Sequence, residues 1–375
     1  MIRVEAAARI DFGGGWTDTP PYSIERGGTV LNAAITLRGN YPIVAGAVWT
    51  DEPRVVLESR DIDAVLVPET AGEVLNYANP ADPFALAKAA LVLKGIVPAD
   101  APADAPLSEL LGGRGLRLFT QTTIPRGSGL GTSSILAGAV LAALDGLQGS
   151  GGTPLDERLD DEGWLSELFD EVLVLEQMLT TGGGWQDQVG GLVGGIKLVT
   201  TEPGLPQRIR TERLELSHPV RQALAERLRL VYTGQQRLAK NLLRQVMGRW
   251  MARDREMMWI LQQIARLALA MRDALLAGDV DGFGELLWEH WLLNRRMDPG
   301  CSNPFIDELF ERMRPYICGG KLAGAGGGGF AIVVARDAGA ADELQAMLQQ
   351  TYPGTAVGVW PSAIPEKGMR VADGE

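Results

Sequence analysis

The chain has 375 residues, of which 46% are hydrophobic, and it carries a formal net charge of −12. Nucleic acids and anionic membranes are negative, so this charge argues against either as a partner. Apolar runs fall short of the roughly 20 residues that span a bilayer, and the first residues lack the layout of a signal peptide. Two cysteines and two histidines are too few for a disulfide framework or a histidine-rich metal site. We therefore expect a cytoplasmic, globular protein with a large core or two lobes.

The order of predicted elements begins with strands and ends in a mostly helical region. Alternating and apolar segments predict strands at 3–12, 28–49 and 54–67, followed by helices at 82–95 and 161–180. Apolar residues three and four positions apart then predict helices at 237–250, 254–277, 281–297 and 305–314. A strand at 331–335, a helix at 340–351 and a strand near 355–359 complete the prediction. This order indicates an α+β protein.

The first predicted strand runs into Gly13-Gly14-Gly15-Trp16-Thr17-Asp18, followed by Thr19 and two prolines. Glycines permit close approach of the backbone, and the prolines stiffen the end of the segment. Trp16 offers an aromatic ring face, and Asp18 can accept hydrogen bonds from hydroxyl groups. We interpret this segment as a ligand-facing loop; the alternative is a plain turn between strands.

The segment from Ile124 to Ser134 is predicted to join a strand to a helix through a tight loop. Gly127, Gly129 and Gly131 alternate along it, which lets backbone N–H groups face inward. A Thr-Ser-Ser cluster then supplies N-capping side chains. Exposed amides at the start of a helix make an anion site, most naturally for phosphate. The segment lacks the lysine of a Walker loop and the spacing of a Rossmann fingerprint.

Two further glycine-rich segments lie later in the chain. The helix predicted at 161–180 carries Glu176 and ends in a Gly-Gly-Gly-Trp-Gln-Asp-Gln loop that contains Gly183, Trp185 and Asp187. Near the end of the chain, seven glycines in the eleven residues 319–329, Gly326 and Gly327 among them, lead into a buried strand. Such a segment is unusual for a mere linker.

Three motifs resemble those of the GHMP kinases, small-molecule kinases named for galactose, homoserine, mevalonate and phosphomevalonate. The string Pro-x-Gly-x-Gly-Leu-Gly-Thr-Ser-Ser from Pro125 is similar to the second motif of that family. Arg9, with Asp18 nine residues on, resembles the first motif. The string Lys-x-x-Gly-Ala-Gly-Gly-Gly-Gly from Lys321 resembles the third.

The wording Gly-Gly-Trp-Thr-Asp-Thr-Pro-Pro-Tyr around Trp16 looks most like the fucokinase branch. Heptose-phosphate kinases have a similar string with glycine at that position. The resemblance implies a two-lobe GHMP fold: a β-rich N-terminal ATP-binding lobe over 1–200, with the phosphate loop and its helix, and a helical α+β lobe over 201–375. By this analogy the C-terminal strands stay with the second lobe, and the active site lies in the cleft between lobes.

The resemblance also assigns roles. ATP would bind at Pro125, Gly127, Ser128, Gly129, Leu130, Gly131, Thr132 and Ser133. Mg²⁺ would be held by Ser133 and Glu176, with Ser134 close enough to compete. Asp187 and Arg9 are the expected catalytic pair, since Asp187 follows Glu176 by eleven residues, as in enzymes of the mevalonate-kinase type. The expected substrate-binding residues are Trp16, Asp18, Gly183, Trp185, Asp187, Gly326 and Gly327.

The expected activity is transfer of a phosphoryl group from ATP to the anomeric hydroxyl of L-fucose or a closely related sugar. The alternatives are a heptose 7-phosphate 1-kinase and a sugar and nucleotide sensor without catalysis. The expected partner is a small-molecule sugar, without nucleic acid or membrane. Many fucokinases are fused to a nucleotidyltransferase; we expect this chain to stand alone or to work with a separate enzyme of that kind. The oligomeric state stays open, with a homodimer among the options.

Overall fold

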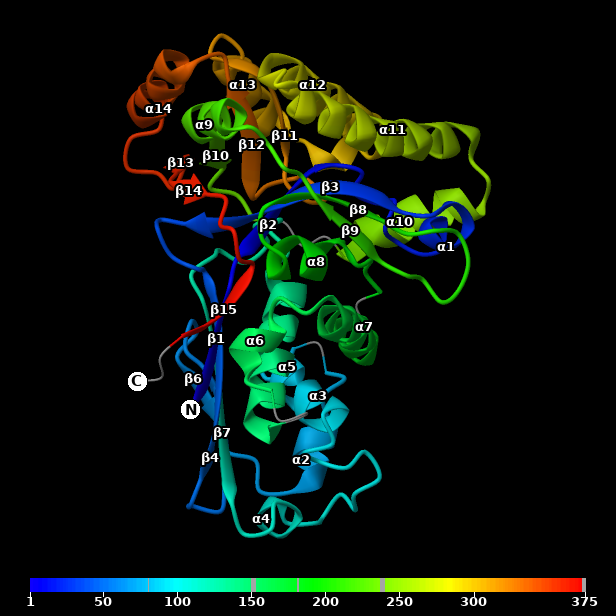
Figure 1. Ribbon diagram of the computed structural model, residues 1–375, viewed down its shortest axis with the longest axis vertical. Coiled ribbons are helices and arrows are strands. Elements are labelled where there is room, and N and C mark those ends of the chain that lie inside the picture. The colour runs from blue at the N-terminus through cyan, green and yellow to red at the C-terminus, as the bar shows by residue number, and fades with distance from the viewer. Residues whose placement is uncertain (80, 150–152, 181, 237–239, 373–375) are drawn as a thin grey trace.

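The computed structural model describes residues 1–79, 81–149, 153–180, 182–236 and 240–372. Figure 1 shows an elongated molecule: one six-stranded sheet with its covering helices forms the lower part, and long helices with a second sheet form the upper part. A third sheet crosses between them. The predicted two-lobe α+β architecture is confirmed.

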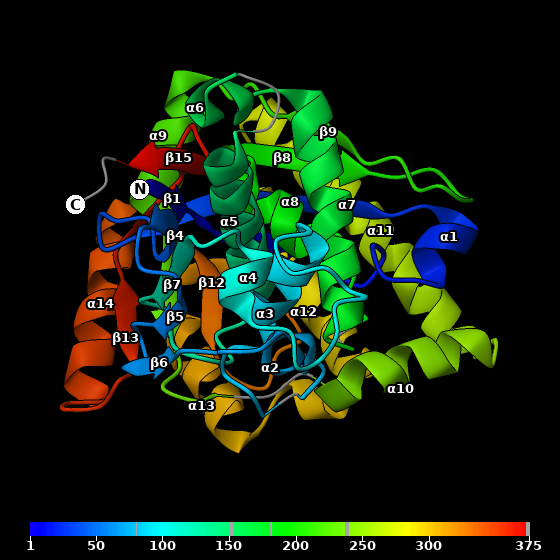
Figure 2. The same ribbon diagram turned by 90° about the horizontal axis from the view of Figure 1, so that it is seen from below.

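The sheet of the lower lobe has the order β15-β1-β4-β7-β5-β6. Its strands are β15 (Met369–Ala372), β1 (Ile2–Ala6), β4 (Ile43–Thr50), β7 (Gly115–Thr122), β5 (Val55–Ser59) and β6 (Ala64–Leu66). Helix α5 (Thr132–Gln148) packs on β1 and β4, and α3 (Ala85–Leu93) and α7 (Glu162–Met178) pack on α5. Figure 2 shows the strands on one side, α5 and α3 beside them, and α7 further out. Because α5 is almost wholly apolar and lies between these layers, its first turn is held firmly.

The sheet between the lobes carries Arg9, and a helix packed on it carries Asp187, the two residues predicted for catalysis. Strand β2 (Ala8–Gly13) pairs with β3 (Thr29–Leu37), which continues through β8 (Ile196–Thr200) to β9 (Arg210–Arg213) and on its other side meets β14 (Ser362–Ala363). Helix α8 (Gln186–Leu192) and helix α11 (Arg255–Ala277) both contact β2 and β3. All six residues of β2 are therefore buried, polar ones included.

The upper lobe is built on an antiparallel sheet of order β11-β12-β10-β13. Its strands are β11 (Ile317–Leu322), β12 (Phe330–Ala335), β10 (Leu228–Tyr232) and β13 (Gly358–Trp360). Helix α12 (Val280–Met297) covers this sheet and also packs on α11. The other helices of this region are α9 (His218–Arg227), α10 (Lys240–Met251), α13 (Pro304–Met313) and α14 (Ala338–Thr351), with the 3-10 turn η1 (Pro299–Cys301).

Short helices complete the described chain: α1 (Tyr22–Arg26), α2 (Ala71–Leu75), α4 (Leu107–Leu110) and α6 (Leu155–Arg158). Across the described residues, no helix is long and apolar enough to cross a membrane.

Most predicted elements are confirmed to within a few residues, but one expectation about the C-terminus is wrong. The last strands do not all stay with the second lobe, since β14 pairs with β3 and β15 pairs with β1. Backbone pairing, not position in the chain, places them there. The first three residues of the helix predicted at 237–250 lie outside the described residues. The division of the chain between residues 200 and 201 stays a prediction.

Candidate active site

The predicted phosphate loop lies between β7 and α5, and its glycines have the backbone that the sequence requires. Gly127, Gly129 and Gly131 have φ angles of 69°, 76° and 74°, all in the left-handed region that favours glycine. A Cβ on Gly129 would lie 2.5 Å from the carbonyl oxygen of Ala323, so the loop also packs closely against the upper lobe. Gly131 forms the N-cap of α5.

The other predicted nucleotide-binding residues surround these glycines. Pro125 is half-buried. The Ser128 carbonyl accepts a hydrogen bond from Phe330 N at 3.2 Å. The Leu130 carbonyl accepts one from Arg9 N at 3.1 Å. The Thr132 hydroxyl is buried and has no hydrogen-bond partner in the described part of the chain.

Arg9 and Asp187 are brought together, as predicted for the catalytic pair. Nε and Nη2 of Arg9 both donate to Oδ1 of Asp187, at 2.8 and 2.6 Å. Nη1 donates to the Gly129 carbonyl at 2.7 Å and to Oδ1 of Asp11 at 3.1 Å. Burial alone would lower the pKa of Arg9, but the two carboxylates outweigh burial and raise it. The Asp187 side chain stays 30% exposed, so this carboxylate can meet a ligand.

Asp187 lies in the first turn of a helix rather than in the loop that the sequence indicates. Helix α8 begins at Gln186, directly after the triple glycine. A carboxylate in the first turn interacts favourably with the positive end of the helix dipole. The carboxylate therefore lies beside the positive end of α8 as well as beside Arg9.

Asp18 is held against the start of the same helix. Gln186 donates to it twice, from the backbone N to Oδ2 and from Nε2 to Oδ1, both at 3.1 Å. A Cβ on Gly184 would collide with Oδ2 of Asp18, which explains the glycine there. Asp18 is 1% exposed. Burial raises its pKa to about 7, and the nearby charge of Asp187 adds to this, while the hydrogen bond from Gln186 opposes it.

The two tryptophans predicted to stack on a substrate differ in exposure. Trp16 is half-buried and has a positive φ of 81°, a strained conformation for a bulky residue. Trp185 is 2% exposed, and a Cβ on Gly28 would lie 2.5 Å from its ring. The expectation that Trp185 presents a ring face is therefore wrong for this structure, because the chain turns inward there and glycine leaves room for the ring.

Glu176 faces the start of α5, and Ser134 is the serine that reaches it. The Ser134 hydroxyl donates to the Glu176 carboxylate, whereas Ser133 is exposed. Burial raises the pKa of Glu176 to about 7; the Ser134 hydrogen bond opposes this, and the charge of Asp187 adds to it. A Cβ on Gly183 would lie 3.2 Å from Oε2 of Glu176, so the predicted Gly183 borders this carboxylate.

These groups fit a bound Mg²⁺ that is completed by other ligands. The described residues contain no cluster of three or more histidine, cysteine, aspartate or glutamate side chains that could hold a metal. Mg²⁺ is, however, usually bound by one or two carboxylates together with waters and substrate phosphates. Glu176 and Ser134 offer a carboxylate and a hydroxyl beside the phosphate loop. A cation there would compensate the buried charge of Glu176.

The third glycine segment joins β11 to β12 and packs against the phosphate loop. A Cβ on Gly329 would collide with the Ser128 carbonyl. The predicted Gly326 and Gly327 both have a φ of 79° and lie against Cys301, whose carbonyl accepts from Gly327 N at 2.5 Å. The structure therefore places these two glycines at the boundary with η1, and the contacts described do not join them to Asp187.

Two charged residues of this region were not predicted. Asp11 contacts Arg9, and Lys321 Nζ contacts the Asp11 carboxylate. Both are buried. Asp11 follows Arg9 by two residues on a strand, a spacing that places both side chains on one face. That signal was available in the sequence, whereas the approach of Lys321 from the other lobe was not.

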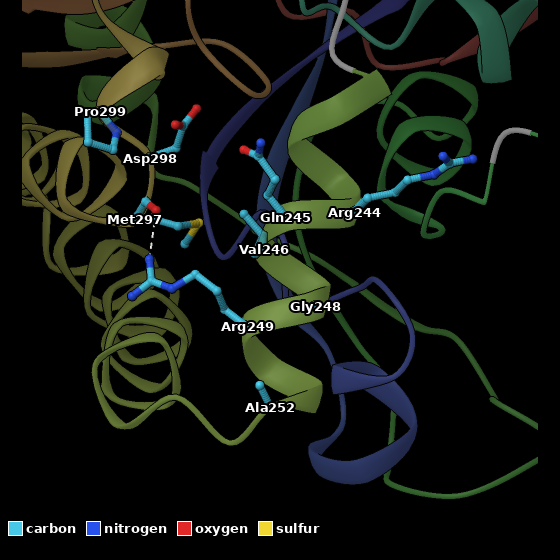
Figure 3. A pocket seen from close by; sticks show the side chains of 9 residues that line it. All are labelled: Arg244, Gln245, Val246, Gly248, Arg249, Ala252, Met297, Asp298 and Pro299. Atoms are coloured by element: carbon cyan, nitrogen blue, oxygen red, sulfur yellow. Dashed lines mark hydrogen bonds between the residues drawn. The ribbon is translucent and has the colours of Figure 1, made fainter.

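A separate surface pocket opens between α10 and the C-terminal end of α12 (Figure 3). Arg249 lines it and donates from Nη1 to the Met297 carbonyl at 3.2 Å. Its described lining contains none of the residues predicted for the site: Arg244, Gln245, Val246, Gly248, Arg249, Ala252, Met297, Asp298 and Pro299.

Comparison with known proteins gives the family. Residues 77–195 match the model of the GHMP kinases N terminal domain, and residues 271–354 match that of the GHMP kinases C terminal. The chain is 41% identical, over 93% of its length, to the bifunctional fucokinase/GDP-fucose pyrophosphorylase of Arabidopsis thaliana. Over 97% of the chain, it is 36% identical to the L-fucokinase/L-fucose-1-P guanylyltransferase of Bacteroides fragilis. The chain spans 31% and 38% of the length of these two relatives.

Among solved structures, a D-glycero-D-manno-heptose 1-phosphate kinase from Bacteroides thetaiotaomicron is similar over 100% of both chains, with a TM-score of 0.71 and 20% identity. This likeness concerns the fold. The domain matches occur in the family's order, and the fold and all three motifs agree with them. The chain belongs to the GHMP kinase family.

Proposed function

We propose that this protein is an ATP-dependent sugar kinase that phosphorylates the anomeric hydroxyl of L-fucose or a closely related sugar. The observation that carries the proposal is the ion pair of Arg9 with Asp187 beside the phosphate loop, where Nε and Nη2 of the guanidinium contact one carboxylate oxygen. A buried arginine next to an accessible carboxylate is suited to phosphoryl transfer, which depends on positioning and charge stabilisation.

The nucleotide is expected to lie at the start of α5. Backbone N–H groups between Gly127 and Ser133 would donate to its phosphates, and the buried Thr132 hydroxyl, which has no partner in the described part of the chain, offers one more donor there. Bound Mg²⁺ would neutralise charge on the phosphates, held by Glu176 with Ser134 and with Ser133 as the neighbouring candidate.

Asp187 orients the sugar hydroxyl and accepts its proton as the oxygen attacks the γ-phosphorus. A bond forms between that oxygen and phosphorus, the bond from the γ-phosphorus to the bridging oxygen breaks, and ADP carries the electron pair away. Arg9 holds Asp187 in place and stabilises negative charge on the transferring group.

The choice of sugar rests on the acceptor side of the site. Trp16 is half-buried and suited to pack against the apolar face of a sugar. Asp18 is 1% exposed and both its oxygens accept from Gln186, so in this structure it holds the start of α8 rather than facing a ligand. The two fucokinase relatives support L-fucose. A D-glycero-alpha-D-manno-heptose 7-phosphate kinase of Campylobacter jejuni, 25% identical over 88% of this chain, keeps a heptose 7-phosphate as the second candidate.

The test is ADP release with Mg·ATP and a panel of L-fucose, D-arabinose, L-galactose, D-mannose and heptose 7-phosphate. We expect turnover of L-fucose or its relatives, and a loss of about 10²- to 10⁴-fold in Asp187→Asn, the usual range for removing a general base. Asp281→Asn is the matched control, because Asp281 is also a first-turn aspartate paired with an arginine, Arg227, but in α12.

Three outcomes separate the candidates. Turnover of L-fucose that is lost only in Asp187→Asn supports the proposal. Turnover of heptose 7-phosphate alone would move the assignment to the second candidate. Saturable sugar binding without turnover of any sugar would instead favour a sensor and overturn the role of Asp187.

A further inference from the structure

Behind the Arg9–Asp187 pair lies a second set of charges that is fully removed from solvent. The side chains of Arg9, Asp11 and Lys321 are 4%, 3% and 0% exposed. Together with Asp187 they make two positive and two negative charges, so the group is balanced. His290 lies beside it, but burial and then the charge of Lys321 lower its pKa to about 3, so it is neutral.

Asp11 is the hub of this group. Its Oδ1 accepts from Arg9 Nη1 at 3.1 Å and from Gly324 N at 2.9 Å. Its Oδ2 contacts Lys321 Nζ, which also donates to the Asp11 backbone carbonyl at 2.8 Å. Burial alone would raise the pKa of Asp11, but Lys321 and Arg9 outweigh burial and lower it, so the carboxylate is ionised.

These contacts fix the guanidinium from two sides. Nε and Nη2 face Asp187, whereas Nη1 is held by Asp11 and by the Gly129 carbonyl. Rotation about the Arg9 side chain would break one set or the other. Without Asp11, a single carbonyl on the phosphate loop would hold the Nη1 side.

Lys321 and Gly324 belong to the other lobe, on β11 and the glycine segment after it. Their contacts with Asp11 tie β2 to that segment, which itself packs against Gly129. Asp11 therefore links the segment of the first motif to that of the third, and both segments contact Gly129 in the phosphate loop of the second motif.

We propose that Asp11, clamped by Lys321 and the Gly324 amide, is a positioning residue that sets the orientation of Arg9 toward Asp187 and the transferring phosphoryl group. This inference rests on the proposed kinase function. Asp11→Asn keeps the size of the side chain and an acceptor for Gly324, but loses the charge. We expect kcat to fall about 100-fold, as misplacement by about 1 Å can cost, while KM for sugar and for ATP changes less than about threefold, since Asp11 touches neither.

Two further variants control for a loss of folding in Asp11→Asn. Asp11→Asn combined with Lys321→Met removes one charge of each sign, so no buried charge is left uncompensated, and it should fold with the same loss of kcat. Asp145→Asn is the matched control, because Asp145 is another buried aspartate paired with a lysine, Lys94 at 2.6 Å. It should keep kcat even if it melts earlier.

A double-mutant cycle tests whether Asp11 acts through Arg9. An Arg9→Lys background keeps the positive charge but lacks the branched guanidinium. In this background Asp11→Asn should lower kcat less than about threefold. An equal loss in both backgrounds, or an effect on KM alone, would overturn the inference.

A second readout does not depend on turnover. The Nε–H resonance of Arg9, identified by its absence in Arg9→Lys, should exchange with solvent at least about tenfold faster in Asp11→Asn than in wild type or Asp145→Asn. Unchanged exchange would overturn the inference even in an active enzyme. Faster exchange in Asp11→Asn than in wild type, when the wild-type protein turns over no sugar, would support the positioning role while the kinase proposal fails.

Discussion

Glu176 and Asp18 are two carboxyl groups buried within reach of the charge on Asp187, and each has a pKa raised to about 7. A carboxyl group whose pKa is higher in the folded state than in the unfolded chain favours folding most at low pH. For Glu176, this contribution is complete below about pH 4.5 and is lost as the pH rises toward 7. The metal-free protein therefore carries a cost at neutral pH that a bound cation would remove.

We predict that Glu176→Gln stabilises the metal-free protein at pH 8 by about 1–3 kcal/mol, the range for a buried group that lacks full compensation. Glutamine can still accept from Ser134. At pH 5, where Glu176 is protonated in the folded state, the variant and wild type should have nearly the same free energy of unfolding. Urea unfolding with a chelator at both pH values measures this.

Glu171→Gln is the control on the same helix, because the Glu171 side chain is 33% exposed and paired with Lys94. Glu171→Gln should not raise the free energy of unfolding at pH 8. A gain for Glu176→Gln of equal size at pH 5 and pH 8 would contradict the assigned cause.

At the scale of elements, α5 has a left-handed glycine at each end, and only one of them borders the site. Gly131, at the N-cap, has a φ of 74°, and a Cβ there would lie 2.9 Å from Arg9 Cγ and 3.2 Å from Asp187 Cβ. Gly149, at the C-cap, has a φ of 66°, and no described atom lies within 4 Å of a Cβ placed on it.

We predict that Gly131→Ala and Gly149→Ala each lower the free energy of unfolding by about 1–2 kcal/mol, the cost of a left-handed residue with a Cβ. Only Gly131→Ala should also lower kcat, by about 100-fold, because it displaces the catalytic pair. Denaturant unfolding and steady-state kinetics on both variants test this. Equal kinetic effects would show that strain in the helix, rather than contact with Arg9 and Asp187, controls the rate.

The elements predicted correctly from the sequence are those in which apolar residues repeat at a regular spacing. Helices α11 and α12 repeat apolar residues along a buried face over 23 and 18 residues, and both were predicted within one residue. Helix α8 was missed because five glycines lie in and before it. Strand β11 was missed because Gly319 and Gly320 weaken the strand pattern. A Cβ on Gly319 would collide with Gly284 of α12, so this glycine serves helix-to-strand packing that sequence alone does not show.

The candidate site was predictable in outline because its residues lie within short motifs. The meeting of Arg9 and Asp187 followed from family resemblance, although 178 residues separate them. The burial of Trp185, the pairing of Ser134 with Glu176 and the contact of Lys321 with Asp11 depend on which side chains the fold brings together. No local pattern encodes those contacts.

At the scale of the whole molecule, the end of the chain completes the first lobe. Strand β15 pairs antiparallel with β1, with Arg3 opposite Ala372, and β14 pairs antiparallel with β3. Figure 1 accordingly shows β15 beside β1 in the lower lobe. The four-residue β15 could not be assigned to β1 from sequence, because pairing over such a separation leaves no local signal.

We predict that a chain truncated after Trp360 aggregates, because loss of β14 and β15 exposes strand edges that template further pairing. A chain truncated after Ala372, which keeps both strands, is the control and should remain monodisperse to the extent that wild type is. Size-exclusion chromatography and thermal unfolding compare the two. Equal behaviour would show that the last strands are dispensable for the lower lobe.

The pairing of β15 with β1 also has a consequence for the protein during its synthesis. Strand β1 is synthesised about 365 residues before β15, so it gains this neighbour only after residue 372 has left the ribosome. At about 5–20 residues per second, this takes roughly 20–70 s. The nascent chain therefore carries an open sheet edge throughout elongation, and chaperones that shield unpaired strands have their target in that interval.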